Sequence, residues 1–161
     1  MAYTTINKSS EHFNTKLYTG TGATHSITGV GHQPDIVWIK DRGRTGYNHC
    51  IADAVRGATK LLRPNLTANE NSPGTYLDSL TSFDSDGFTL GADTSNGEQN
   101  INSQTYVSWN WKANGAGSSN TDGSITSTVS ANTTSGFSIV SWTGNGGTAS
   151  VGHGLGVKPN I

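Results

Sequence analysis

One short segment of the chain alternates strictly between two kinds of side chain. Over residues 106–112, Tyr106, Ser108 and Asn110 fall on one side, and Val107, Trp109 and Trp111 fall on the other. A period of two residues is the signature of a β-strand, because successive side chains of a strand point to opposite faces. The two indoles and the valine predict that their side of this strand faces a core.

A second segment, residues 36–40 (IVWIK), is almost continuously apolar. Such a run is typical of a strand that is buried on both faces, and we expect it at the centre of a sheet. Gly, Thr, Ser and Asn together make up nearly half of the chain, and aromatic residues make up 8%. Thr and aromatic residues favour strands, whereas Gly, Asn and Ser favour turns. The sequence therefore predicts an all-β fold, an antiparallel β-sandwich with many turns.

Charge and apolar patterning exclude several functional classes. The net charge is only −1, so no electrostatic footprint for nucleic acid is present and we expect no nucleic-acid partner. No apolar run approaches the roughly 20 residues of a membrane-spanning helix, so we expect no membrane insertion, and no secretory signal is visible. A single cysteine, Cys50, excludes an internal disulfide and a multi-cysteine metal site.

The chain contains an internal repeat. Residues 13–36 and 137–161 align with one inserted residue, and the alignment pairs Phe13 with Phe137 and a Thr-Gly turn and a Pro in the same order. The second copy stops where the apolar strand would begin. We therefore expect an N-terminal docking segment (1–12), a β-sandwich (13–112), a Gly/Ser/Asn linker (113–123) and an incomplete second β module (124–161). Either the natural chain is longer, which we favour, or residues 124–161 complete a neighbouring subunit.

Two groups of polar residues are candidate binding sites. Asp84 and Asp86 precede Gly87 and loosely resemble half of a Ca²⁺ loop, since alternate carboxylates can converge on one cation. No fitting Glu follows, and an Asp-Gly hairpin turn explains them more simply. The only basic cluster is a solvated loop or a patch for an acidic partner, and its arginines are Arg42, Arg44, Arg56 and Arg63.

The sequence gives little support for a catalytic site. The five histidines are scattered without zinc spacing, and a position in loops or facing solvent explains them. Cys50 follows His49, but adjacent strand residues point to opposite faces, so a buried structural cysteine is favoured over a nucleophile. No acidic pair stands out as a glycosidase pair. Trp109 and Trp111 would offer a sugar-stacking surface only if an indole faced outward.

Five segments together resemble one family. Those at 13–20, 33–40, 53–60, 80–91 and 106–112 resemble an uncharacterised domain that is common in tail-fibre and other virion proteins of marine bacteriophages and cyanophages. The resemblance covers about residues 12–112 and implies a sandwich similar to concanavalin-A-like and laminin-G-like domains, with jelly-roll topology. It carries over no catalytic residue and no cofactor.

This resemblance implies a structural virion protein, the N-terminal part of a phage tail fibre or tail-associated fibre. Its partners would be other tail proteins, sister chains in a homotrimer and, through distal modules, a host surface glycan. We expect it in the virion tail and not as an enzyme. Two alternatives stay open, a carbohydrate-binding lectin-like module with or without Ca²⁺ and a capsid decoration protein.

Overall fold

A computed structural model describes residues 6–70, 78–94 and 97–158. Within these ranges the regular elements are β-strands and one 3-10 turn, η1 (Ser9–Glu11). No helix in the described ranges is long and apolar enough to span a membrane. The fold is all-β with antiparallel sheets, which confirms the fold class predicted from the strand and turn pattern.

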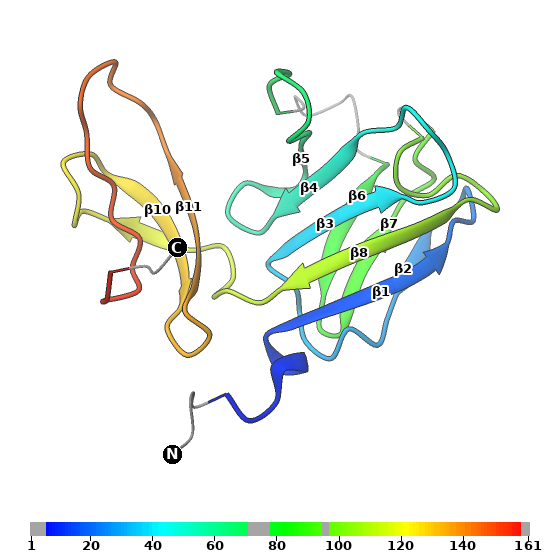
Figure 1. The fold of residues 1–161 in the computed structure, drawn as a ribbon, viewed down its shortest axis with the longest axis horizontal. Helices are drawn as coiled ribbons and strands as arrows, with labels where there is room; N and C mark the ends of the chain where they lie inside the picture. Colours follow the sequence, from blue (N-terminus) through cyan, green and yellow to red (C-terminus); the bar gives the residue numbers. More distant parts are fainter. Residues whose placement is uncertain (1–5, 71–77, 95–96, 159–161) are drawn as a thin grey trace.

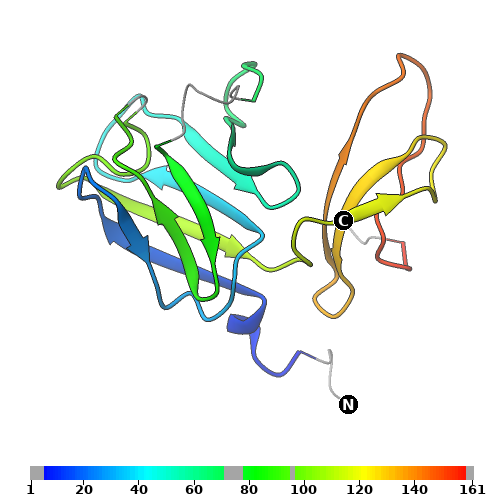
Figure 2. The same cartoon turned by 180° about the vertical axis from the view of Figure 1, so that it is seen from behind.

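Two antiparallel sheets pack face to face as a sandwich (Figure 1). One has five strands in the order β1-β8-β3-β4-β5, and the other has three in the order β2-β7-β6. Figure 2 shows the three-stranded sheet lying across one face of the five-stranded sheet. The strands are β1 (Phe13–Thr19), β2 (His25–Ile27), β3 (Ile36–Asp41), β4 (His49–Asp53), β5 (Gly57–Leu62), β6 (Leu80–Asp84), β7 (Gly87–Leu90) and β8 (Thr105–Trp111).

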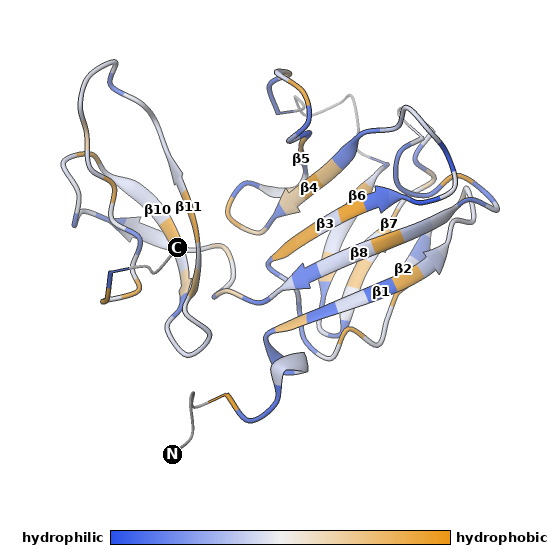
Figure 3. Ribbon diagram, viewed as in Figure 1, coloured by the Kyte–Doolittle hydropathy of each residue, from blue (hydrophilic) through white to orange (hydrophobic). Residues whose placement is uncertain are grey.

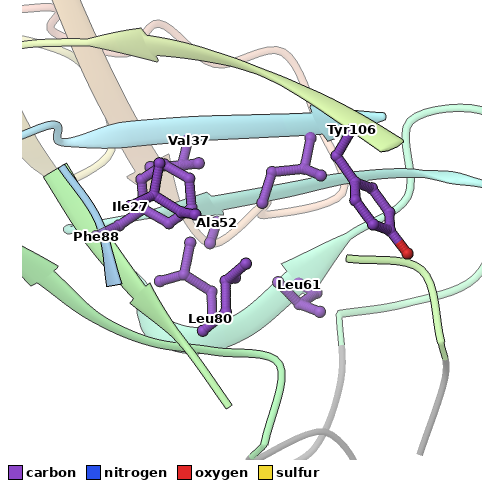
Figure 4. Close-up of a cluster of buried hydrophobic side chains, with 9 residues drawn as sticks. Ile27, Val37, Ala52, Leu61, Leu80, Phe88 and Tyr106 are labelled. Atoms are coloured by element: carbon purple, nitrogen blue, oxygen red, sulfur yellow. The ribbon is translucent and has the colours of Figure 1, made fainter. Parts of the chain in front are cut away.

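The core lies between these two sheets (Figure 4). Tyr106 of β8 and Phe88 of β7 are its largest members, and both are fully buried. Burial of one large apolar side chain contributes about 1.5–3 kcal/mol, so this layer supplies most of the driving force for folding. The other buried members are Ile27, Val37, Ile39, Ala52, Leu61, Leu80 and Leu90.

Strand β3 is central, as predicted, but only one of its faces is fully buried. Val37 and Ile39 point into the core, while Ile36, Trp38 and Lys40 are half-buried on the outer face. The expectation of burial on both faces is therefore wrong. Lys40 shares the parity of Trp38, and a lysine seldom occupies a fully buried position.

The predicted orientation of β8 is also wrong. Tyr106, Ser108 and Asn110 are buried, whereas Val107, Trp109 and Trp111 lie half-buried on the outer face. The polar core positions are only partly hydrogen-bonded, since Asn110 Oδ1 is buried without a partner in the part of the chain that the structure describes. Asn110 Nδ2 donates to the carbonyl of Asn14 on β1 at 3.0 Å and to Ser108 Oγ at 3.1 Å.

Residues 113–158 form a second unit, the C-terminal sheet. It contains β9 (Ser118–Asn120), β10 (Ser127–Asn132) and β11 (Phe137–Trp142), in the order β11-β10-β9. Figure 3 shows apolar positions along β3 and β4 of the sandwich and along β11. The segment 113–123, expected to be a linker, instead contains β9, which pairs with β10. The repeat aligns two edge strands, β1 and β11, which begin at Phe13 and Phe137.

The N-terminal segment is packed against the sandwich over part of its length. The carbonyl of Ser10 lies 3.0 Å from His32 Nδ1, and Lys112 N–H donates to the carbonyl of His12 at 2.8 Å. The expectation of a segment that orders only on binding is wrong for these residues. Residues 1–5 of the expected docking segment lie outside the described residues.

Candidate functional site

The outer face of the five-stranded sheet carries a groove with aromatic walls. Trp38 of β3, Trp109 and Trp111 of β8 and His49 of β4 line a hollow of about 260 Å³, called here the tryptophan groove. Trp38 and Trp109 are register partners on neighbouring strands, and their rings meet edge to face with centroids 6.0 Å apart at 68°. Because Trp109 and Trp111 lie on the outer face of β8, they meet Trp38 and His49 on the surface of the sheet and not in the core.

A hydrogen bond fixes the proton of His49. Trp38 Nε1–H donates to His49 Nδ1 at 2.9 Å. An indole nitrogen can only donate, so Nδ1 is an acceptor and the neutral ring carries its proton on Nε2. Burial, followed by the nearby charge of Lys40, lowers the pKa of His49, so the ring is neutral near pH 7. The groove therefore has an imidazole wall in a single protonation state.

A buried polar cluster anchors the strand that carries His49. Glu98 accepts hydrogen bonds from Asn48 Nδ2 at 2.6 Å, Cys50 Sγ at 3.2 Å and Arg63 Nε at 2.7 Å. Asn48 and Cys50 flank His49 in the sequence and hold β4 from its inner side. The position of the imidazole on the outer face is thereby set from within the sandwich.

The lining of the tryptophan groove bears no charge. Lys40 lies beside His49 in the register, but its ammonium donates to the backbone carbonyls of Asp41 at 3.1 Å and Tyr47 at 3.0 Å. The four lining side chains are three indoles and one neutral imidazole. The groove therefore offers mainly apolar ring surface to a ligand.

Apolar surface continues from the groove toward the C-terminal sheet. Trp111 contacts Phe13 with ring centroids 4.9 Å apart and stacks on Phe137 at 6.3 Å. Leu17, on the same outer face, is 62% exposed. The groove is thus part of a larger apolar face, and Trp111 joins it to the second unit.

The predicted basic cluster is not a free cationic patch. Arg44 Nε donates to Asp41 at 2.6 Å, and Arg56 Nε donates to Asp53 at 2.6 Å. Arg63 is buried and paired with Glu98, as described above. Arg42 is exposed. Three of the four arginines are therefore neutralised inside this part of the fold, and the expected patch for an acidic partner is not assembled.

Asp84 and Asp86 lie at the turn between β6 and β7, where Asp84 is the register partner of Gly87. Asp84 accepts hydrogen bonds from the hydroxyls of Ser82 at 2.8 Å and Thr89 at 2.6 Å. Both residues therefore serve the hairpin turn that the Asp-Gly pattern predicted, and the oxygens of Asp84 point to protein donors.

Asp86 fastens a neighbouring loop. Its two carboxylate oxygens accept backbone N–H groups of Gly29 at 2.9 Å and Gly31 at 2.6 Å, and these bonds lower its pKa. Among the described residues no group of three or more His, Cys, Asp and Glu side chains is arranged to hold a metal ion. The donor set expected for Ca²⁺ is thus engaged within the protein.

Cys50 and His49 point to opposite sides of β4, as strand geometry predicts. Cys50 is buried, and burial, reinforced by Glu98, raises the pKa of its thiol well above the ordinary value. This is the reverse of what a nucleophile needs. His32 lies in the loop between β2 and β3, as expected, although it is buried; His25 and His49 lie in strands β2 and β4 and depart from the expectation.

Sequence reasoning singled out Trp109 and Trp111 but missed Trp38 and His49. Lys40 could have revealed Trp38, because residues two apart in a strand share a face and a lysine indicates the outer face of β3. His49 carried no comparable signal, because its place beside Trp38 depends on the register between β3 and β4.

The comparisons with known proteins identify a family without a described activity. No curated protein and no solved structure matches the chain. A family model described as "Domain of unknown function (DUF7483)" matches residues 8–161, a range that takes in the sandwich and the C-terminal sheet. The chain therefore belongs to the DUF7483 family.

Proposed function

We propose that this protein is a structural virion component, part of a phage tail fibre or a tail-associated fibre, that attaches to the tail and presents modules for host adhesion. The resemblance of five sequence segments to virion proteins supports this proposal. The observation that carries it is the joint between the sandwich and the C-terminal sheet, which is built as a fixed connection.

Buried hydrogen bonds form the first part of this joint. Asp35, just before β3, donates its N–H to the carbonyl of Trp111 and accepts the N–H of Ala113 on its carboxylate, both at 2.7 Å. Asn114 N–H then donates to Ser130 Oγ of β10 at 2.8 Å. The chain is thus held on both sides of the point where it leaves the sandwich.

Side-chain contacts form the second part. Trp111 at the end of β8 stacks on Phe137 at the start of β11, and Asn132 Nδ2 donates to the carbonyl of Lys112 at 3.5 Å. A Gly/Ser-rich linker would behave as a flexible coil. A joint held by buried bonds and ring stacking suits a protein that must keep successive modules at a set angle.

The surface suits assembly by shape. With a net charge of −1, ionic steering contributes little, and contacts are made through hydrogen bonds and apolar patches. Trp142 on β11 is 56% exposed, and Leu17 on β1 offers a second apolar contact. We propose that these surfaces serve contacts with other tail proteins and with sister chains in a homotrimer.

Immunogold labelling of purified virions tests the location. Antibody raised against the recombinant protein should label the tail, and antibody pre-absorbed with the same protein should label nothing. Dense labelling of the head would instead identify a capsid decoration protein. Mass spectrometry of disrupted virions shows whether the chain is present in the particle. If it is present but intact particles carry no label, an exposed fibre role would be overturned.

Sedimentation equilibrium of the recombinant protein tests the assembly. A mass of three chains is expected, and a monomer at all concentrations reached would overturn the homotrimer.

A further inference from the structure

We propose that the tryptophan groove is a binding site for a single neutral sugar ring, a pyranose of a surface polysaccharide. This inference goes beyond the structural role in a fibre and stands on different observations. It rests on the geometry of Trp38, His49, Trp109 and Trp111.

The walls of the groove match the apolar face of a pyranose. An aromatic ring has a negative face, which attracts the weakly positive C–H groups that a sugar presents on one side of its ring. Trp38 and Trp109 meet edge to face at 68°, and both rings line the hollow. A hollow of about 260 Å³ is small for an extended ligand but suits one ring.

The polar groups of the groove are donors. His49 has its neutral proton on Nε2, because Nδ1 accepts from Trp38. Among the residues that the structure describes, the indole N–H groups of Trp109 and Trp111 have no acceptor. Sugar hydroxyl oxygens accept hydrogen bonds, and they surround a ring whose C–H face is stacked. The groove therefore combines a predominantly apolar lining with a small number of N–H donors, among them Nε2 of His49.

The charge of the groove selects a neutral ring. No ionised side chain lines it, and Lys40 keeps its ammonium on two backbone carbonyls. A carboxylated or sulfated sugar would give up hydration at an aromatic surface without gaining a cationic partner.

Titration of the recombinant full chain with methyl glycosides tests the proposal. The probes are the methyl glycosides of glucose, galactose, mannose and N-acetylglucosamine, with glucuronic acid and cyclohexanol as comparisons. The chain has four tryptophans, so the indole N–H region of a ¹H–¹⁵N spectrum contains few signals. At least one neutral glycoside should shift the Trp38 and Trp109 signals saturably in the millimolar range, and leave the Trp142 signal in place.

Matched variants separate the groove from other surfaces. Trp109→Ala should weaken binding by at least about tenfold, as expected for an aromatic residue at the centre of a contact. Trp142→Ala removes an exposed indole outside the groove and should bind as the parent does. Trp109→Phe keeps a ring and should retain part of the affinity, which guards against a fold defect in the alanine variant.

Three results would overturn the proposal. These are no saturable shift with any neutral glycoside, equal shifts with cyclohexanol and the best glycoside, or equal loss of binding in the Trp109 and Trp142 variants. A change of sedimentation mass in Trp109→Ala without a change in glycoside binding would assign the groove to chain association instead. These tests use the isolated protein, so their failure leaves the virion labelling result standing, and the reverse also holds.

Discussion

Trp111 and Phe137 stack across the joint between the two units, with ring centroids 6.3 Å apart and planes inclined by 20°. Trp111 ends the last strand of the sandwich, and Phe137 begins the edge strand of the C-terminal sheet. This pair is one of the side-chain contacts between the two units, together with the hydrogen bonds of Ser130 and Asn132.

Replacing Phe137 by alanine should loosen the C-terminal sheet. An aromatic pair is worth about 0.5–1.5 kcal/mol beyond its buried area, so the amides of β11 should lose a comparable free energy of protection. Hydrogen exchange followed by mass spectrometry measures this. Trp142→Ala, at the exposed end of the same strand, is the control and should change protection little. Equal losses in both variants would show that the stack does not hold the joint.

Replacing Arg63 by methionine should destabilise the sandwich strongly. Arg63 and Glu98 are both buried and lie 2.7 Å apart, and removal of one partner leaves a buried charge without its counterion. Such changes cost about 3–5 kcal/mol. Urea unfolding followed by tryptophan fluorescence gives the difference. Arg42→Met, at an exposed arginine, should stay within about 0.5 kcal/mol of the parent. A small effect at Arg63 would mean that Asn48 and Cys50 hold Glu98 sufficiently.

Acid should weaken the fold partly through Glu98. Burial alone would raise its pKa, but hydrogen bonds from Arg63, Asn48 and Cys50 outweigh burial and lower it. A carboxyl with a depressed folded pKa adds stability above its unfolded pKa of about 4.3, and this is lost as pH falls through the folded value. Unfolding free energies measured from about pH 7 down to about pH 3 should therefore fall less steeply in Glu98→Gln. An unchanged acid slope in that variant would contradict this contribution.

Cys50 should resist thiol reagents until the sandwich opens. Burial, with the charge of Glu98 beside it, raises the thiol pKa, and only the thiolate reacts. Since Cys50 is the single cysteine, labelling by a disulfide reagent at mildly alkaline pH reports on one group. Labelling should be slow in buffer and rapid in urea above the unfolding midpoint. Rapid labelling of the folded protein would show that β4 opens locally.

The strands with the clearest periodicity were predictable from sequence, but their orientation was not. Alternation over residues 106–112 shows that two faces exist without saying which one is buried. The choice depends on Asn110, whose hydrogen bond reaches Asn14 across 96 positions of the chain. A contact at that separation has no local signature. Lys40, by its parity with Trp38, held the information that the outer face of β3 could not be core.

The segment 113–123 was misjudged for a related reason. Ser118–Asn120 has no apolar side chain and weak strand propensity, so local sequence favours a loop. It is a strand because β10 offers a partner, with Val129 opposite Ser118. The arginine cluster differs in part, because Asp41 and Asp53 lie only three residues before Arg44 and Arg56, whereas Glu98 reaches Arg63 across 35 positions of the chain. Tertiary partners decided strand β9 and the Arg63–Glu98 pair.

Phe13 and Trp111 are register partners, and this pairing decides where a mechanical load would enter the sandwich. The polypeptide enters the sandwich at Phe13 and departs at Trp111, two neighbours at one end of the body (Figure 1). In the register, Ile36 of β3 lies beside Trp111 and Asp41 lies beside Tyr106, so the loop that follows Asp41 is at the opposite end of the sheet from the two points where the chain enters and leaves. A pull applied between Phe13 and Trp111 would therefore load the β1–β8 pairing from one end.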